Sequence, residues 1–180
     1  TGYFLDQNDN STTADSLQDP FTFNYDSHYA GLCAEGSFGP RTIYTSELVF
    51  EGGRAGTSNG GISREKVDAA ATWVSLFHRL EGTSLPTLLF DYAWGSGDAS
   101  RFSVTDSGPR GPRSGNGDQN FIGFGRFDGG LALQPRLSNL HVIRFGFQFK
   151  PFTELDPPAD LLIGFKVSDY EKSTLNGPIS

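Results

Sequence analysis

The chain lacks methionine entirely and has a single cysteine, Cys33, among its 180 residues. One cysteine cannot form an internal disulfide, whereas small domains made in an oxidising secretory pathway often carry several. A chain that opens at Thr1 and has no methionine has not kept an initiator, so we expect it to be cut from a longer polypeptide. These features favour folding in the cytosol, in bacteria, or in a virus whose proteins fold in the cytosol and are displayed outside afterwards.

Positive charge is scarce, and long apolar runs are missing. Fourteen Lys and Arg against twenty-one Asp and Glu give a net charge of −7, which opposes nucleic-acid binding because counterion release needs clustered cations. No stretch reaches the roughly 20 apolar residues of a helical membrane span, so we expect no membrane insertion. The length suits a single domain, which we assign to residues 1–180, with residues 1–20 as a polar N-terminal arm.

Aromatic residues, by contrast, are plentiful, at 13% of the chain. In the segment 141–150, Ile143, Phe145, Phe147 and Phe149 fall on one side of an extended strand, while polar side chains such as Arg144 fall on the other. This period of two is typical of a half-buried strand. We therefore expect the aromatic side to pack into a dry interior.

Similar alternation recurs along the chain, with glycine and proline between the alternating segments. It predicts about eight or nine strands in all, at 21–25, 43–50, 87–94, 101–105, 121–127, 130–133, 141–150 and 161–167. Glycine and proline predict loops at 51–61 and 107–118. Turns rather than repeated helices separate the strands, which favours an antiparallel β-sandwich or β-barrel, jelly-roll-like, with long loops.

One segment has a different period. Between residues 63 and 81 the apolar positions recur at helical spacing, with Ser63 available as a cap and Gly82 as a stop. We predict a helix here, the one helix of the domain. The rival interpretation is a strand around Trp73 to Phe77.

The strongest enzymatic signal is the segment 56–60, Gly-Thr-Ser-Asn-Gly, which matches the G-x-S-x-G string of hydrolases around Ser58. Asp91 and His141 follow in the chain order that such hydrolases use. The mechanism requires the serine on a tight turn between a strand and a helix, and five residues separate Phe50 from Gly56. A chance match in a glycine-rich loop is favoured, so a serine hydrolase is an alternative and no catalytic residue is assigned.

Metal and cofactor binding are not expected. His28, His78 and His141 are scattered and, with one cysteine, give no zinc spacing. Asn10 begins an Asn-Ser-Thr triplet, which fits the pattern for N-glycosylation and is relevant only in a secretory host.

Recognition of a ligand is what remains. Trp94 opens the loop at 95–98, where its ring can stack on a sugar while Asp98 binds hydroxyl groups. Arg110 and Arg113 stand on a Gly/Pro loop above an acidic body and can meet an acidic glycan or a carboxylate of a protein partner. The alternatives are that Trp94 closes the hydrophobic core and that the two arginines are solvated surface charges.

Two short segments carry likenesses to lectins. The run Thr-Leu-Leu-Phe-Asp-Tyr-Ala-Trp at 87–94 resembles a strand of laminin-G and pentraxin-like domains, and 150–158 with Gly164, Phe165 and Asp169 is similar to the start of an H-type lectin repeat. These resemblances imply a carbohydrate-binding module.

As a whole, the chain resembles in its construction the protruding spike domains of small non-enveloped RNA virus capsids, such as those of astroviruses. The shared features are an excised β-domain without disulfides, an aromatic core and long Gly/Pro/Ser/Asn loops. The resemblance implies a non-enzymatic domain on the virion surface, or otherwise extracellular, that attaches to a host glycan or protein receptor. It also implies a homodimer or larger homo-oligomer, with no cofactor.

Overall fold

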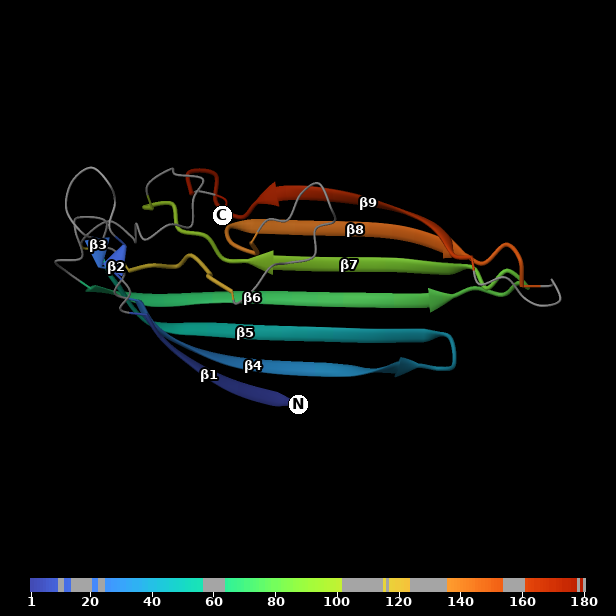
Figure 1. The fold of residues 1–180 in the computed structure, drawn as a ribbon, viewed down its shortest axis with the longest axis horizontal. Coiled ribbons are helices and arrows are strands. Elements are labelled where there is room, and N and C mark those ends of the chain that lie inside the picture. The colour runs from blue at the N-terminus through green and yellow to red at the C-terminus, as the bar shows by residue number, and fades with distance from the viewer. Residues whose placement is uncertain are drawn as a thin grey trace.

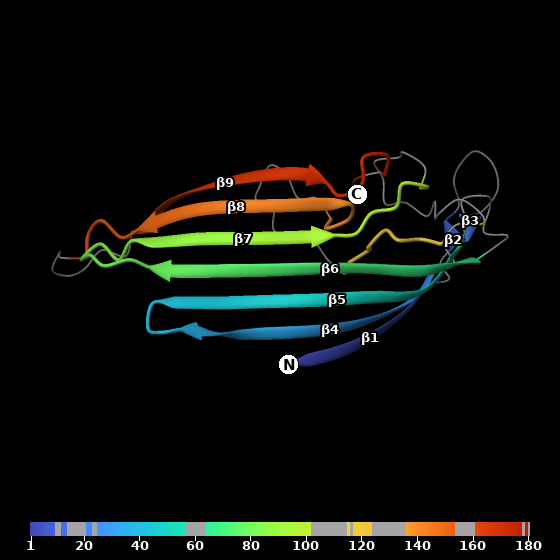
Figure 2. The ribbon, with the colours of Figure 1, turned by 180° about the vertical axis from the view of Figure 1, so that it is seen from behind.

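A computed structural model describes residues 1–9, 12–13, 21–22, 25–56, 64–101, 115, 117–123, 136–153, 161–177 and 179. Seven strands form one antiparallel sheet in the order β1-β4-β5-β6-β7-β8-β9, which Figures 1 and 2 show from opposite sides. The large sheet is not closed, and the residues just given contain no helix, so the mainly-β antiparallel class is confirmed. The strand bounds are β1 Gly2–Asp9, β2 Thr12–Thr13, β3 Phe21–Thr22, β4 Tyr25–Phe38, β5 Thr42–Gly56, β6 Arg64–Arg79, β7 Thr87–Gly95, β8 Leu140–Phe149 and β9 Ile163–Lys172.

From β4 onward, each strand of the large sheet pairs with the next strand in sequence, while β2 and β3 pair separately between β1 and β4. The turn from β4 to β5 contains Gly39 at a φ of +69°, a left-handed conformation that glycine adopts without steric cost. Farther along β5, a Cβ on Gly53 would lie 2.1 Å from the carbonyl oxygen of Asp26, so no larger residue fits there. Glycine thus allows both the turn and the close approach of β5 to β4.

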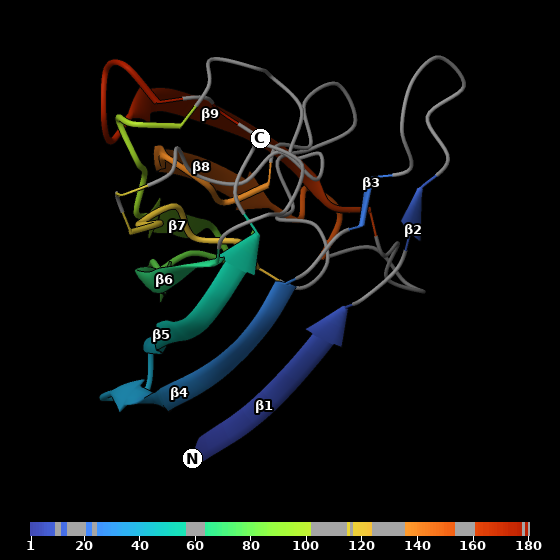
Figure 3. The same cartoon turned by 90° about the vertical axis from the view of Figure 1, so that its left-hand side faces the viewer.

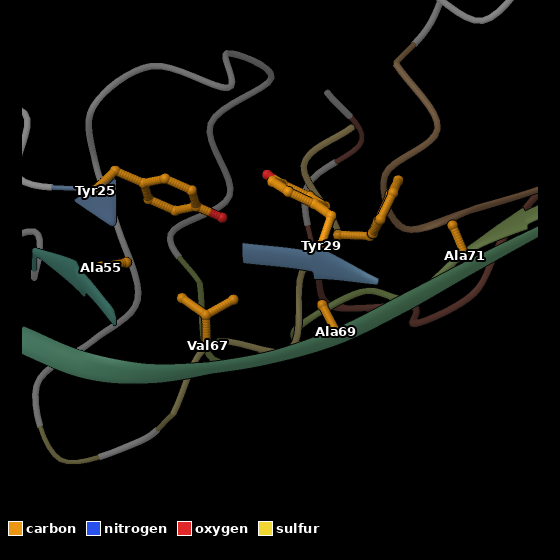
Figure 4. Packing of buried hydrophobic residues seen from close by; sticks show 7 residues of the cluster. Tyr25, Tyr29, Ala55, Val67, Ala69 and Ala71 are labelled. Atoms are coloured by element: carbon orange, nitrogen blue, oxygen red, sulfur yellow. The ribbon is translucent and has the colours of Figure 1, made fainter. Parts of the chain in front are cut away.

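The large sheet is curved. Figure 3 shows its strands arranged along an arc, which gives the sheet a concave and a convex face. On the concave face, Tyr25 and Tyr29 of β4 pack with Val67 and Ala69 of β6 and with Phe121 from the segment 117–123. Figure 4 shows the two tyrosine rings above β6 with their hydroxyl groups directed toward each other. The main hydrophobic cluster therefore lies inside the arc.

The segment 117–123 covers part of the concave face and is fixed to β6 through its backbone. Asp118 N donates to the carbonyl oxygen of Lys66 at 2.7 Å, and Asp68 N donates to the carbonyl oxygen of Asp118 at 2.9 Å. These bonds form a parallel bridge between Asp118 and Val67, on the part of β6 that extends beyond β7. The bridge holds Phe121 over the cluster.

The helix predicted at 63–81 is wrong, because residues 64–79 form β6. Along its length β6 pairs with β5, and from Ala71 to Arg79 it pairs with β7 as well. Pairing on two sides satisfies the backbone groups of the strand and overrides its local helical spacing. The rival prediction of a strand around Trp73 to Phe77 is confirmed.

Two further predictions need correction. Residues 2–9 are not part of a polar arm but the edge strand β1, which pairs with β4 from Gly2 opposite Leu32 to Asp9 opposite Tyr25. The loop predicted at 51–61 is wrong for residues 51–56, which continue β5, and residues 57–61 lie outside the described part. Most of the segments predicted as strands at 101–105, 121–127 and 130–133, and as a loop at 107–118, also lie outside it.

The alternation predicted at 141–150 is confirmed in β8, but the predicted burial is reversed. Arg144 is only 5% exposed on the concave face, whereas Phe145 is 60% exposed on the convex face. Alternation separates the two faces of a strand, yet which face is covered depends on what packs against it. Here the covered face is the one that carries the arginine.

Candidate functional site

Of the four residues predicted to bind a ligand, Arg110 and Arg113 lie outside the described residues. Trp94 is half-buried near the end of β7, on the convex face. Its Nε1 donates to Ser173 Oγ at 2.9 Å, and its ring centroid lies 6.3 Å from that of His141. Trp94 is thus held between β7 and the turn after β9.

Asp98 does not stand open to solvent as the sequence suggested. It is 7% exposed, and its Oδ1 accepts hydrogen bonds from the backbone N of Ser100 at 2.8 Å and from Ser100 Oγ at 2.7 Å. Its Oδ2 faces the backbone N of Gln119 at 3.5 Å. The carboxylate therefore stabilises the turn that follows β7.

The residues proposed for a hydrolase do not converge within the described residues. Ser58 lies outside them, so its role stays a prediction. Asp91 lies on the concave face of β7, where it accepts a hydrogen bond from Ser75 Oγ at 2.6 Å. His141 lies on the convex face of β8, where its Nδ1 is 3.0 Å from the hydroxyl of Tyr92. The sheet itself separates Asp91 from His141.

A different site is present on the concave face, where a cavity of about 540 Å³ lies between the sheet and the segments 121–123 and 136–137. Aromatic rings from four places line it, namely Tyr3 of β1, Tyr29 of β4, Trp73 and Phe77 of β6, and Phe121. Rings of this kind offer flat apolar surfaces on which a ligand can stack. The cavity has the size and the mixed lining of a small-molecule site.

The floor of this cavity is a polar row that runs across four strands. Thr45 lies directly opposite Ser75, Ser75 opposite Asp91, and Asp91 opposite Arg144. Ser75 and Arg144 are buried, at 2% and 5% exposure. The row therefore presents adjacent hydrogen-bond donors and acceptors on the partly desolvated floor of the cavity, where hydrogen bonds are stronger than in water.

Three further charged residues, Glu47, Arg136 and Lys166, line the cavity wall. The hydroxyl of Tyr3 donates to Glu47 Oε1 at 2.6 Å. Burial, and secondly the bond to Glu47, raise the pKa of the Tyr3 hydroxyl, so that it remains a protonated donor near neutral pH. The bond from β1 to β5 fixes the edge of the cavity.

Beside the cavity, the buried carboxylate of Glu51 joins β4, β5 and the segment 117–123. Its Oε1 accepts hydrogen bonds from the hydroxyl groups of Tyr25, of Ser27 at 2.8 Å and of Tyr29 at 3.0 Å. Its Oε2 accepts from the backbone N of Ile122 at 2.9 Å. Burial raises the pKa of Glu51, while these hydrogen bonds act in the opposite direction.

The raised pKa of Glu51 predicts a stability that falls as the pH rises. The folded protein holds the Glu51 proton more tightly than the unfolded chain, whose pKa stays near the ordinary value of 4.5. The resulting stabilisation is fully present below pH 4.5 and is lost as the pH rises through the folded value. Urea unfolding at a series of pH values tests this, because Glu51→Gln should flatten that part of the profile. An equal slope in both proteins would contradict the assignment.

A buried ion pair also fixes the position of the segment 117–123. Arg101 donates from Nε to Asp118 Oδ1 at 3.0 Å and from Nη2 to Asp118 Oδ2 at 2.5 Å, and the two side chains are 6% and 0% exposed. The backbone N of Asn120 also donates to Asp118 Oδ1 at 3.0 Å. Burial raises the pKa of Asp118, and the Arg101 guanidinium opposes that rise. The pair connects the turn after β7 to the cover of the concave face.

Sequence reasoning missed the residues that build this site. Trp73 was assigned to a helix, and Glu51 was assigned to a glycine-rich loop. Arg144 was placed on the face opposite the predicted core. The sequence does contain one indication of the site, which is the alternation along β5. Glu47 and Glu51 fall on one face of the strand, and Leu48 and Phe50 fall on the other. A polar face of a strand can line a binding site as well as face solvent.

Within the described ranges, no group of three or more His, Cys, Asp or Glu side chains is placed to hold a metal ion. The same ranges contain no helix long and apolar enough to cross a membrane. Comparisons with family models, with curated proteins and with solved structures found no match.

Proposed function

We propose that the chain is a recognition module that binds a saccharide on the concave face of its sheet without altering it chemically. The observation that carries the proposal is the lining of the cavity, where the rings of Tyr3, Trp73 and Phe77 stand beside a row of hydroxyl and ionic groups. A sugar presents an apolar ring face together with several hydroxyl groups. Stacking on the rings and hydrogen bonding to the polar row satisfy both.

The polar row supports binding more than catalysis. Asp91 accepts a hydrogen bond from Ser75 and lies opposite Arg144 in the register. His78 and His141, which each lie three register positions from Asp91, project from the other face of the sheet. Groups held in this way can orient hydroxyl groups of a bound saccharide.

Replacing Trp73 with alanine should weaken saccharide binding about tenfold, or about 1.4 kcal/mol, because one of the aromatic stacking surfaces of the cavity is lost. The saccharide is first identified on an array of neutral and acidic glycans and its affinity is then measured by calorimetry. Trp94→Ala is the matched control, since it removes the other tryptophan from the opposite face.

A second variant, Lys166→Gln, removes a positive charge from the cavity wall at an exposed position. It should weaken the binding of acidic glycans more than that of neutral ones.

Attachment of a virion to a host receptor is the narrower form of this proposal, supported by the resemblance to capsid spikes. In that form the binding residues were expected in the loop that carries Arg110 and Arg113. Shortening the loop between residues 108 and 117 separates the two locations. Glycan binding that survives this deletion but is lost in Trp73→Ala supports the cavity, and the reverse result overturns it.

A further inference from the structure

The convex face of the large sheet is covered with exposed apolar side chains. Phe145 is 60% exposed, Phe165 66% and Val167 65%, although all three lie in the paired strands β8 and β9. Comparable side chains project from the same face of β1, β4, β5 and β7. Monomeric proteins in water rarely expose one continuous apolar patch over a whole sheet.

We propose that this convex face lies against the hydrocarbon interior of a lipid bilayer. The concave face combines the hydrophobic cluster with buried polar side chains, namely Glu51, Ser75 and Arg144. The convex face instead exposes phenylalanine and aliphatic side chains. Polar groups in the interior together with large apolar side chains on the exposed face are expected where the surroundings are less polar than water.

The width of the apolar surface fits a bilayer. On the convex face of β6, Asp68 and His78 stand at the two ends, with Ala70, Thr72, Val74 and Leu76 between them. Thr72 is the one polar residue of this stretch, and its hydroxyl donates to the backbone carbonyl oxygen of Glu47 at 2.9 Å. Asp68 and His78 are ten positions apart, and a tilted strand needs about 9–11 residues to cross the hydrocarbon. The apolar stretch of β6 is therefore long enough for a full crossing.

The polar boundary of the convex face crosses the strands obliquely. The register places Asp169 opposite Ile143, Ile143 opposite Tyr92, and Tyr92 opposite Val74. The first carboxylate on this face of β9 is therefore level with Val74, six residues along β6 from Asp68. A flat slab that meets tilted strands produces a boundary of this kind.

The opposite boundary is displaced in the same direction. His78 ends the apolar surface on β6, but the residues level with it on the next three strands are Leu88, Phe147 and Phe165. On β8 and β9 the apolar surface continues to Phe149 and Ile163, one register step farther. The first limit is displaced by six residues between β6 and β9 and the second by two in the same direction, so the apolar surface is an oblique band.

The curvature of the sheet favours lipid over a second copy of the chain. Figure 3 shows that the strands follow an arc. The exposed apolar side chains lie on its convex side, so two such faces touch along a narrow strip only. Acyl chains conform to a convex surface. The sequence-based expectation of no membrane insertion rested on the absence of a long apolar run. That criterion detects membrane-spanning helices but not strands, because strands in a membrane alternate apolar and polar residues.

The proposal also requires partners for the two edge strands, because hydrocarbon cannot satisfy exposed backbone groups. In the described residues β1 and β9 each pair on one side only. Trp94 has the position expected at a bilayer boundary, since its ring lies on the apolar face while its Nε1 donates to Ser173. The two tryptophans of the chain, Trp73 and Trp94, thus report on opposite faces.

Fluorescence quenching by brominated lipid tests the proposal. The chain is reconstituted into vesicles of dioleoylphosphatidylcholine, part of which carries bromine near the top of its acyl chains. In Trp73→Phe the remaining Trp94 should be quenched several-fold more strongly than Trp73 is in Trp94→Phe. Equal quenching of both, or quenching of Trp73 alone, overturns the proposal, as does a chain that stays out of the vesicles as a dimer or monomer in water.

A pair of charge substitutions provides a second measurement. Phe145→Asp places a carboxylate on the convex face and should abolish stable association with the same vesicles. Gln148→Asp places the same group on the concave face of the same strand and should leave association unchanged. Equal behaviour of the two variants contradicts the proposal. Neither measurement depends on saccharide binding, so the two proposals fail separately.

Discussion

Replacing Glu51 with alanine should lower the free energy of unfolding by about 3–5 kcal/mol, because the carboxylate is buried and hydrogen-bonded at both oxygens. The variant removes the acceptor shared by Tyr25, Ser27 and Tyr29 and the acceptor of the Ile122 backbone N. It also leaves a cavity under the segment 117–123. Urea unfolding followed by tryptophan fluorescence measures the loss.

Two controls make the Glu51 result specific. Glu51→Gln keeps the shape and one acceptor oxygen, so its loss should be smaller than that of the alanine variant. Glu47→Ala removes a half-buried carboxylate that accepts a hydrogen bond from Tyr3, and should cost about 1 kcal/mol. If the free energy of unfolding of Glu51→Ala lies within about 0.5 kcal/mol of that of the original chain, the hydrogen bonds of Glu51 do not hold the segment 117–123 in place.

Replacing Arg101 with alanine should be of similar severity, with a loss of about 3–5 kcal/mol at neutral pH. The variant leaves the Asp118 carboxylate buried without its cationic partner, at a position that is 0% exposed. The destabilisation should shrink as the pH falls, because protonation of Asp118 removes the uncompensated charge. Urea unfolding at neutral and acidic pH checks both the size and the pH dependence.

The matched control for Arg101 is an exposed ion pair. Arg41 lies 2.5 Å from Glu81, with the two side chains 49% and 78% exposed, and Arg41→Ala should cost less than about 1 kcal/mol. A double variant, Arg101→Met with Asp118→Leu, should recover much of the stability lost in Arg101→Ala. A loss in Arg101→Ala that is no larger than in Arg41→Ala contradicts the role given to the buried pair.

The strands were largely predictable from the sequence because alternation of side chains is a local property. The predicted segments 87–94 and 141–150 match β7 and β8 to within one residue at each end, and 43–50 lies inside β5, which continues to Gly56. The segment 63–81 was ambiguous, since its apolar positions fit both periods. Pairing with β5 and β7 decided the outcome, and that pairing joins residues far apart in sequence.

The covered face of the sheet could not be predicted from alternation alone. The aromatic side of β8 was expected to be buried, whereas Arg144 and Val142 are the buried side chains there. Burial on the concave face depends on the segment 117–123 and on the curvature of the sheet, neither of which leaves a local pattern. The same reason explains why Trp94 and Asp98 were chosen as binding residues and Trp73 was not.

The two proposals together assign one environment to each face of a single sheet. The concave face, with Glu51 and the row from Thr45 to Arg144, forms a partly desolvated polar site. The convex face, with Phe145 and Phe165, contacts hydrocarbon. Each assignment explains why a residue type lies where water-soluble proteins would not place it.

A spin-label scan of β8 tests the opposite environments of the two faces most directly. Cys33 is replaced by serine, a nitroxide is attached at successive single cysteines from residue 141 to residue 149, and accessibility to oxygen and to a water-soluble nickel complex is measured in lipid vesicles. Oxygen accessibility should peak at the odd-numbered positions, including 143, 145 and 147, with the even-numbered positions low. A scan without a period of two, or with oxygen access highest at 142 and 144, would contradict the account.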